Sequence, residues 1–271
     1  MFDINQQEFK QFADYIKSLY GIYLKDEKKT MVAGRLNQVL LNMNMKSLTE
    51  YMNYVMADKT GQASSEMLNR ITTNHTFFMR ESAHFQYFED KVLPYLSATV
   101  KDKNLRIWSA ACSTGEEPYT LAMIIDRFFG HKKAEWDAKI LATDISQSVL
   151  STANAGIYSR DNVANLPEAW KKQYFKEDEA GNYILSEKIK KEVIFNRINL
   201  MDPVFPFKRK MHAIFCRNVM IYFDNATKDK LVEHLYEITE PGGFLFIGHA
   251  EVLNREKTQF KYLMPAVYRK E

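Results

Sequence analysis

The stretch that decides the fold is Trp108-Ser109-Ala110-Ala111-Cys112-Ser113-Thr114-Gly115-Glu116-Glu117-Pro118. The run 105–108, apolar except for Arg106, indicates a buried strand, and the small residues after it favour a tight turn. Pro118 suits the first turn of a helix, which we predict to run from about Pro118 to Phe129. A strand, a tight turn and a helix in this order are typical of an α/β fold.

The alternation of strands and helices continues towards the C-terminus. Strands are predicted at 139–143, 212–216 and 244–248, and helices at 146–155 and 227–239. We expect Pro241-Gly242-Gly243 to break the chain before the strand that begins at Phe244, and Ala266–Arg269 to form a final edge strand. This order predicts an α/β fold with a parallel, Rossmann-like sheet that is covered on both faces.

The first 73 residues show helical patterns only. Asn5 with Glu8 forms a capping-box pattern that predicts the start of a helix, and Gly21 predicts the end of that helix. Apolar residues at helical spacing predict four short amphipathic helices in a small bundle. We therefore expect a helical domain at 1–73, a linker with a leading helix at 74–99, and an α/β domain at 100–271.

One segment interrupts the α/β alternation. Between Gly156 and Leu200, a polar helix and a turn at 180–182 are flanked by the short apolar runs Tyr183–Leu185 and Val193–Phe195. The segment is too long for an ordinary loop. It predicts a small antiparallel β-subdomain inserted at about 157–198. The sequence is consistent with two roles for this segment: contacts with a partner, or covering the edge of the sheet.

Composition excludes several classes of protein. The 271 residues are 46% apolar and carry a formal net charge of +3, with basic and acidic residues interleaved. No basic stripe is visible, which argues against tight nucleic-acid binding. Cys112 and Cys216 have no metal-ligand spacing, and no apolar run approaches the roughly 18 residues of a membrane span. A metal-free, cytoplasmic monomer that does not insert into the membrane is the expectation.

The turn and the end of the next strand predict a nucleoside ligand. Ligands of open α/β sheets bind at the carboxyl ends of strands, where the carboxylate of Asp144 can accept hydrogen bonds from ribose hydroxyls. Dinucleotide folds use three glycines around a pyrophosphate, but this turn has only Gly115. Glu116 and Glu117 would repel a pyrophosphate and suit an ammonium or sulfonium. This favours S-adenosylmethionine over NAD, although both glutamates also suit a helix N-terminus.

Three further groups of residues are candidates for the same crevice. Arg217 and Asn218 follow the strand at 212–216, and Tyr222 comes a few residues later with a hydroxyl that can reach the reacting centre. Arg80 lies in the connection between the helical and α/β domains. The alternative interpretations are a tyrosine at the edge of the core and an exposed interdomain arginine.

Taken together, these strings resemble the chemotaxis receptor methyltransferase family (CheR-type) over essentially the whole chain. The strings that carry the resemblance are Asn74-His75-Thr76-Phe77-Phe78-Met79-Arg80, the turn at 108–119, Ala142-Thr143-Asp144-Ile145, Asn199-Leu200 and the stretch 215–223. Each is weak alone, but their order and spacing are specific. The resemblance implies a Rossmann-like class I methyltransferase sheet, a small N-terminal all-α domain and an inserted antiparallel β-subdomain.

Members of this family are cytoplasmic enzymes that transfer the methyl group of S-adenosylmethionine to glutamate side chains of chemoreceptors. S-adenosylhomocysteine is the product. The resemblance implies cofactor contacts from Asn74, Thr76, Arg80, Glu117, Asp144, Asn199, Leu200, Arg217 and Asn218. It also implies that Arg80 and Tyr222 lie beside the transferred methyl group.

The partner that the resemblance implies is the cytoplasmic helical bundle of a chemoreceptor. Lys28, Lys29 and Arg35 are the expected docking residues, although a solvated helix face is the alternative interpretation. In some members the β-subdomain grips a peptide at the receptor's C-terminus. The turn around Gly181 lacks the glycine-rich loop typical of those members, which argues against tethering here.

The expected chemistry needs no general base. A glutamate side chain has a pKa of about 4.3, so the acceptor is already a carboxylate nucleophile at neutral pH. Catalysis is then expected from alignment and from removal of water around that carboxylate. The alternatives are an NAD-dependent dehydrogenase, a non-catalytic S-adenosylmethionine-binding signalling module, and a methyltransferase with another acceptor.

Overall fold

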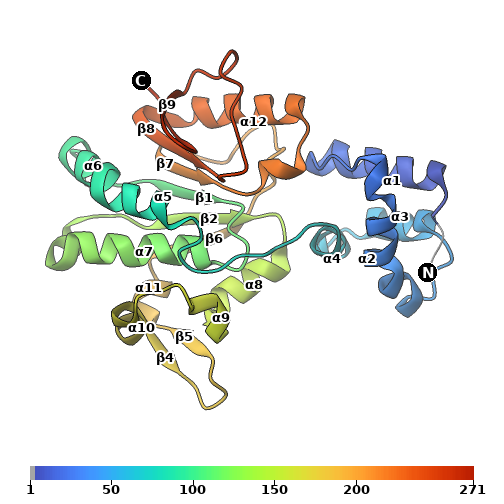
Figure 1. The fold of residues 1–271 in the computed structure, drawn as a ribbon, viewed down its shortest axis with the longest axis horizontal. Coiled ribbons are helices and arrows are strands. Elements are labelled where there is room, and N and C mark those ends of the chain that lie inside the picture. The colour runs from blue at the N-terminus through green and yellow to red at the C-terminus, as the bar shows by residue number, and fades with distance from the viewer. Residues whose placement is uncertain (1–3) are drawn as a thin grey trace.

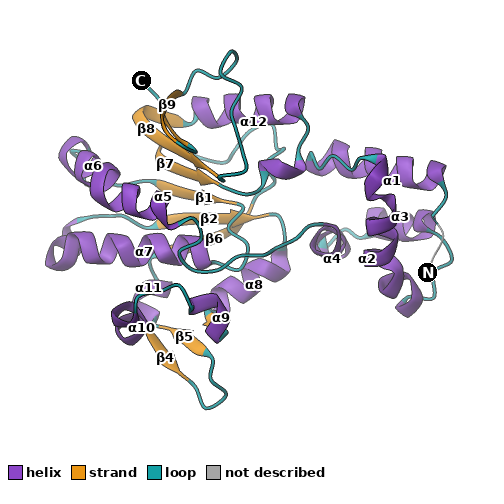
Figure 2. Ribbon diagram, in the orientation of Figure 1, coloured by secondary structure: helices purple, strands orange, loops and turns teal. Residues whose placement is uncertain are grey.

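The computed structural model describes residues 4–271. A helical domain lies at one end of the molecule, a seven-stranded sheet with helices on both faces forms its body, and a three-stranded sheet projects from one side (Figures 1 and 2). This arrangement confirms the predicted α/β class with its all-α domain and its inserted antiparallel sheet.

The helical domain contains the four predicted α-helices. They are α1 (Gln6–Tyr20), α2 (Lys29–Asn42), α3 (Leu48–Ala57) and α4 (Gln62–Ile71), with a short 3-10 helix, η1 (Asp26–Lys28), before α2. The predicted capping box forms, because Asn5 accepts from the Glu8 amide and Glu8 accepts from the Asn5 amide. Gly21 ends α1 in the left-handed conformation, with φ of 71°.

The large sheet has the strand order β6-β2-β1-β7-β8-β10-β9. Its strands are β1 (Ile107–Ala110), β2 (Ile140–Asp144), β6 (Val193–Arg197), β7 (Met211–Cys216), β8 (Thr239–Ile247), β9 (Lys261–Met264) and β10 (Val267–Arg269). The first five in spatial order are parallel, and β10 and β9 pair antiparallel. The order reverses between β1 and β7, which is where such sheets bind ligands.

Side chains of the central strands alternate between two hydrophobic clusters. Ala213 and Phe215 of β7 pack on one face, and Ile214 and Cys216 pack on the other. The first face is covered mainly by α5 (Ser82–Tyr87), η2 (Phe88–Val92), α6 (Leu93–Thr99) and α7 (Glu116–Phe129), and the second by α12 (Asn225–Glu237) (Figure 2). Burial of every β7 residue explains its continuous apolar sequence.

The small sheet confirms the predicted excursion but is shorter than predicted. It contains β3 (Ile157–Tyr158), β5 (Tyr183–Leu185) and β4 (Phe175–Glu177), and the same segment holds α9 (Arg160–Val163), α10 (Glu168–Tyr174) and α11 (Glu187–Lys190). Assigning Val193–Phe195 to this excursion was wrong, because these residues pair parallel with β2 of the large sheet. As an edge strand, β6 is only partly buried, which makes its sequence look like that of a hairpin strand.

Two predictions near the C-terminus were also wrong. Pro241-Gly242-Gly243 does not precede a strand, because β8 runs through it with an irregular register opposite β7. Gly242 takes a φ of 79° there and donates to the Lys270 carbonyl, so the chain bends without leaving the sheet. The stretch ending at Arg269 is not the edge, since β10 lies between β8 and β9.

Three helical segments complete the chain: α8 (Gln147–Ala155), η3 (Gly130–Glu135) and η4 (Met220–Tyr222).

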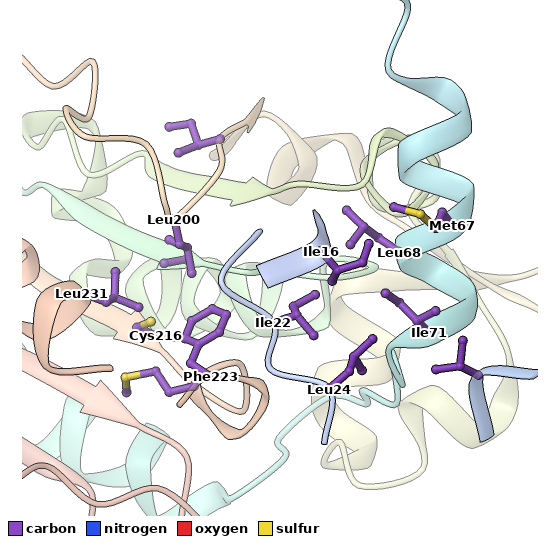
Figure 3. Close-up of a cluster of buried hydrophobic side chains, with 14 of the residues drawn as sticks. Ile16, Ile22, Leu24, Met67, Leu68, Ile71, Leu200, Cys216, Phe223 and Leu231 are labelled. Carbon is purple, nitrogen blue, oxygen red and sulfur yellow. The ribbon is translucent and has the colours of Figure 1, made fainter. Parts of the chain in front are cut away.

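The helical domain contacts the α/β domain directly, in addition to the linker that connects them. Figure 3 shows Ile16, Ile22 and Leu68 of that domain in one buried cluster with Leu200 and Phe223 of the α/β domain. The backbones also meet, because the Tyr23 amide donates to the Tyr222 carbonyl over 2.7 Å.

Candidate functional site

A cavity lies where the carboxyl ends of the parallel strands face the helical domain. We call the lining residues at the strand ends its sheet wall (111–113, 117, 144–146, 198–200, 217–219, 222 and 223). The linker residues 72–77 and Arg80, with Tyr20, Ile22, Leu68 and Asn69, form its helical wall. The cavity sits beside the reversal of strand order between β1 and β7. Its position is therefore the one expected of a ligand site in an open α/β sheet.

The turn after β1 brings one glutamate to the cavity and buries the other. Gly115 has a φ of 94°, and a side chain there would begin 2.9 Å from the Ala153 methyl. Glu117 then lines the cavity, whereas Glu116 is fully buried behind it. The Glu116 carboxylate accepts from Asn162 over 3.0 Å and from the Thr114 hydroxyl over 2.7 Å.

Glu117 shares a guanidinium with a second carboxylate. Arg217, whose side chain is only 2% exposed, donates from Nη1 to Glu117 over 2.9 Å and from Nη2 to Glu81 over 3.0 Å. The Ser109 hydroxyl also donates to Glu117 over 2.7 Å. Burial raises the pKa of Glu117, and the charge of Arg217 opposes that rise.

Asp144 stands at the end of β2 with two fixed backbone donors. Its carboxylate accepts from the Ser113 amide over 2.9 Å and from the Ser146 amide over 3.0 Å, and burial raises its pKa. Each carboxylate oxygen keeps further acceptor capacity towards the cavity. The Ser113 hydroxyl oxygen is buried and has no hydrogen-bond partner among the described residues. These features fit a polar ligand such as a ribose.

The linker residues are held in place largely by backbone acceptors. Arg80 donates from Nη1 to the His75 carbonyl over 2.6 Å, which closes the linker on itself. The Tyr222 hydroxyl donates to the Thr73 carbonyl over 3.0 Å and accepts from the Thr73 amide over 3.1 Å. Tyr222 therefore fastens the helical wall to the sheet wall. Asn74 donates to Asn69 of α4 over 3.1 Å.

Asn199 and Asn218 also connect separate parts of the site. Asn199 donates to the Leu19 carbonyl at the end of α1 over 2.7 Å. Asn218, with a left-handed φ of 57°, donates to Glu81 over 3.0 Å. Gly248 leaves room for Asn218, because a side chain on Gly248 would collide with the Asn218 side-chain nitrogen Nδ2.

The structure brings together on this cavity all the residues predicted to contact the cofactor or the methyl group: Asn74, Thr76, Arg80, Glu117, Asp144, Asn199, Leu200, Arg217, Asn218 and Tyr222. Their contacts with a cofactor stay predictions. Sequence reasoning gave no role to Glu81 or to the Ser113 hydroxyl. The only local signal for Glu81 is its place next to Arg80, since its partners are distant in the sequence.

The predicted docking residues do not form one free surface. Arg35 is engaged, because its Nη1 donates to the Ile71 carbonyl over 2.8 Å and to the Thr72 carbonyl over 3.2 Å. Arg35 thus binds the carboxyl end of α4, which gives it a structural role, and its docking role stays a prediction. Lys28 is exposed and Lys29 is half-buried at the start of α2.

One cluster beside the cavity has donor atoms of the metal-binding type. Within residues 4–271, the donor atoms of Glu81, His84 and His249 lie within 4.8 Å of one another. The Glu81 carboxylate already accepts from Arg217, from Asn218 and from the His249 amide. Burial lowers the pKa of His84 to about 4, so its imidazole is neutral near pH 7.

The part of the chain that the structure describes contains no helix long and apolar enough to cross a membrane.

Comparison with known proteins identifies the family. The family model described as CheR methyltransferase, all-alpha domain, matches residues 7–72, and the one described as CheR methyltransferase, SAM binding domain, matches residues 74–268.

Among named relatives, the chemotaxis protein methyltransferase of Borreliella burgdorferi is 39% identical over 99% of this chain and 95% of its own. A probable chemotaxis protein methyltransferase of Rhizobium etli is 38% identical over 87% of this chain and 89% of its own. The chemotaxis protein methyltransferase of Escherichia coli is 31% identical over 98% and 91%. The chain therefore belongs to the CheR methyltransferase family, and its α/β part is the S-adenosylmethionine-binding domain.

Proposed function

We propose that this chain transfers the methyl group of S-adenosylmethionine to glutamate side chains of chemoreceptors, forming methyl esters. Family membership and the names of the relatives support methyl transfer in chemotaxis. The observation that carries the proposal is the cavity itself, where Arg80, Glu117, Asp144 and Tyr222 converge from four separate segments.

The residues present fit the cofactor. Asp144 and the unpartnered Ser113 hydroxyl would hold the ribose, and Glu117 would face a cationic group of the cofactor. The absence of a glycine-rich pyrophosphate cradle around Gly115 agrees with a ligand without phosphate. When bound, S-adenosylmethionine supplies an electrophilic methyl group on a sulfonium.

The chain's own residues then have to align and desolvate an acceptor carboxylate. Arg80 lines the cavity with only one nitrogen, Nη1, engaged by His75 among the described contacts. Its guanidinium can therefore orient a carboxylate through further hydrogen bonds. We expect the helical wall to keep water from the sheet wall when ligands are bound, which strengthens such charge interactions. An ionised glutamate needs no base, so no proton transfer is assigned to the neutral His84 nearby.

We assign the helical domain to residues 1–73, the linker and its helix to 74–99, and the transfer domain to 100–271. The inserted subdomain within it ends before β6, at about residue 190. The partner we propose is the helical bundle of a chemoreceptor, met by Lys28, Lys29 and Arg35, of which Arg35 also binds the carboxyl end of α4.

The test is methyl transfer to receptor-containing membranes with methyl-labelled S-adenosylmethionine. We expect alkali-labile label, since esters hydrolyse in base and N-methyl groups do not. Arg80→Ala should lower the rate about 100-fold, because it removes a charged hydrogen-bonding group from the reacting carboxylate. Its thermal unfolding should match that of the parent protein.

The matched control is Arg209→Ala, which removes an arginine of the α/β domain that is paired with Asp102 outside the cavity. This variant should keep the parent rate. A receptor whose acceptor glutamates are replaced by alanine should take up no label. Base-stable label, or an unchanged rate in Arg80→Ala, would contradict the proposal.

A further inference from the structure

Glu81 lies directly behind the cavity, although it is not part of either wall. Its two carboxylate oxygens accept from Arg217 Nη2 over 3.0 Å, from Asn218 Nδ2 over 3.0 Å and from the His249 amide over 3.2 Å. Arg217 also donates from Nη2 to the Arg80 carbonyl over 2.5 Å. Glu81 thus connects two residues of the sheet wall to the end of the linker.

The backbone around Glu81 has an uncommon conformation. Met79 and Glu81 have left-handed φ values of 61° and 57°, which L residues with long side chains rarely adopt. Such conformations persist where the surrounding contacts over-determine them. The linker is therefore held in a strained path that delivers the Glu81 carboxylate to Arg217.

The positive charge of Arg217 is outnumbered by the negative charges around it. One guanidinium, which stays protonated in proteins, faces two carboxylates, Glu81 and Glu117. Burial alone would raise the pKa of Glu81, but the hydrogen bond from Asn218 and the charge of Arg217 outweigh it and lower the pKa to about 2. Without Glu81, the positive charge of Arg217 would compensate the negative charge of Glu117 completely. With Glu81 ionised, the group retains one negative charge.

We propose that Glu81 is a positioning residue that neutralises Arg217 from behind and so leaves Glu117 with an uncompensated charge for the cationic part of the cofactor. This inference rests on the proposed contact between Glu117 and the cofactor. It explains why the buried arginine, Arg217, does not cancel the attraction of the cavity for a cation. Arg217 instead fixes the position of the Glu117 carboxylate.

The test compares ligands of different charge on Glu81→Gln, which keeps the side-chain size and one acceptor oxygen. S-adenosylmethionine has a sulfonium and an ammonium, S-adenosylhomocysteine has only the ammonium, and adenosine has neither. By calorimetry we expect the dissociation constant to rise about tenfold for S-adenosylmethionine, by less for S-adenosylhomocysteine, and hardly at all for adenosine.

Two variants keep the result interpretable. Glu81→Asp retains the charge, so it should restore the preference for S-adenosylmethionine over adenosine even if all affinities fall. Glu192→Gln removes a carboxylate from a comparable ion pair with Lys133, before β6 and away from the cavity, and should change none of the three affinities. If Glu81→Gln does not fold, the preference measured in Glu81→Asp decides the matter: a preference lost despite the retained charge would overturn the inference.

Equal losses for all three ligands in Glu81→Gln would show a purely structural role and overturn the inference, as would no loss at all. Glu117→Gln separates this failure from failure of the cofactor contact. If Glu117→Gln keeps the full preference for the cationic ligand, the proposed Glu117 contact is wrong. If it loses the preference while Glu81→Gln keeps it, only the role of Glu81 is wrong.

Discussion

The two walls of the cavity are built in different ways. The sheet wall follows directly from strands whose backbones are paired, and the turn after β1 is tied to the neighbouring strand by backbone bonds such as that from the Cys112 amide to the Thr143 carbonyl over 2.8 Å. The helical wall is attached by single contacts between distant segments. These include Tyr222 with Thr73 and Asn199 with Leu19, together with the apolar cluster of Figure 3.

Because the two walls are built differently, we expect substitutions in them to have different effects on folding and on ligand binding. Apart from Tyr222 and Asn199, residues of the sheet wall belong to the cooperative core, so their replacement should affect both folding and ligand binding. Residues that attach the helical wall should affect binding and turnover while the fold stays intact. Elements that admit and enclose ligands are drawn from the less stable parts of proteins.

The largest effect on binding should come from Asp144→Ala. The substitution removes a buried charged acceptor from the proposed ribose site and leaves the Ser113 and Ser146 amides without a partner. Hydrogen bonds to charged groups contribute about 1.5–3 kcal/mol, so the dissociation constant of S-adenosylhomocysteine should rise about 100-fold. Calorimetry measures this directly. Unchanged affinity would remove Asp144 from the site.

The next largest effect should be on stability, in Gly115→Ala. At a φ of 94°, with the Ala153 methyl 2.9 Å from the new carbon, the substitution should lower the free energy of unfolding by about 2 kcal/mol. Gly34→Ala is the control, because Gly34 lies in α2 with open space around it. That change should stabilise by about 0.5–1 kcal/mol. Urea denaturation of both variants tests the contrast.

Binding should also weaken in acid because of Glu117. Burial raises its pKa, so it loses its charge at a higher pH than an exposed glutamate does. Affinity for S-adenosylmethionine should be complete above that pKa and fall, by at most about tenfold per pH unit for one proton, as the pH drops through it. Glu81, with a pKa lowered to about 2, stays ionised meanwhile. Calorimetry from about pH 5 to 8 should show a smaller slope in Glu117→Gln.

The strand ends were easier to predict from the sequence than the roles of Glu81 and Arg35, for a physical reason. Asp144, Arg217 and Asn218 each follow an apolar strand directly, and parallel strands bring their carboxyl ends together. The roles of Glu81 and Arg35 depend on partners that are distant along the chain: Glu81 and Arg217 are 136 residues apart, and Arg35 binds the end of another helix. No local pattern encodes such contacts.

The same reasoning explains the errors in the sheet. The run Val193–Phe195 has the length and partial burial of a hairpin strand, and only its pairing with β2 places it in the large sheet. When only the local sequence is considered, Pro241 and Gly242 indicate a break before the strand. The structure keeps them in β8 because an irregular register absorbs the turn.

The smallest effect should come from Tyr222→Phe, which tests how the helical wall is attached. The substitution keeps the ring against the cavity but removes the hydroxyl that binds both the amide and the carbonyl of Thr73. Thr73 is exposed, so water can replace the lost partner and the fold should keep its stability. The turnover of methyl transfer should fall about fivefold, which corresponds to the loss of about one net hydrogen bond in closing the site. A clear fall in the free energy of unfolding of this variant would show instead that the two walls form one cooperative unit.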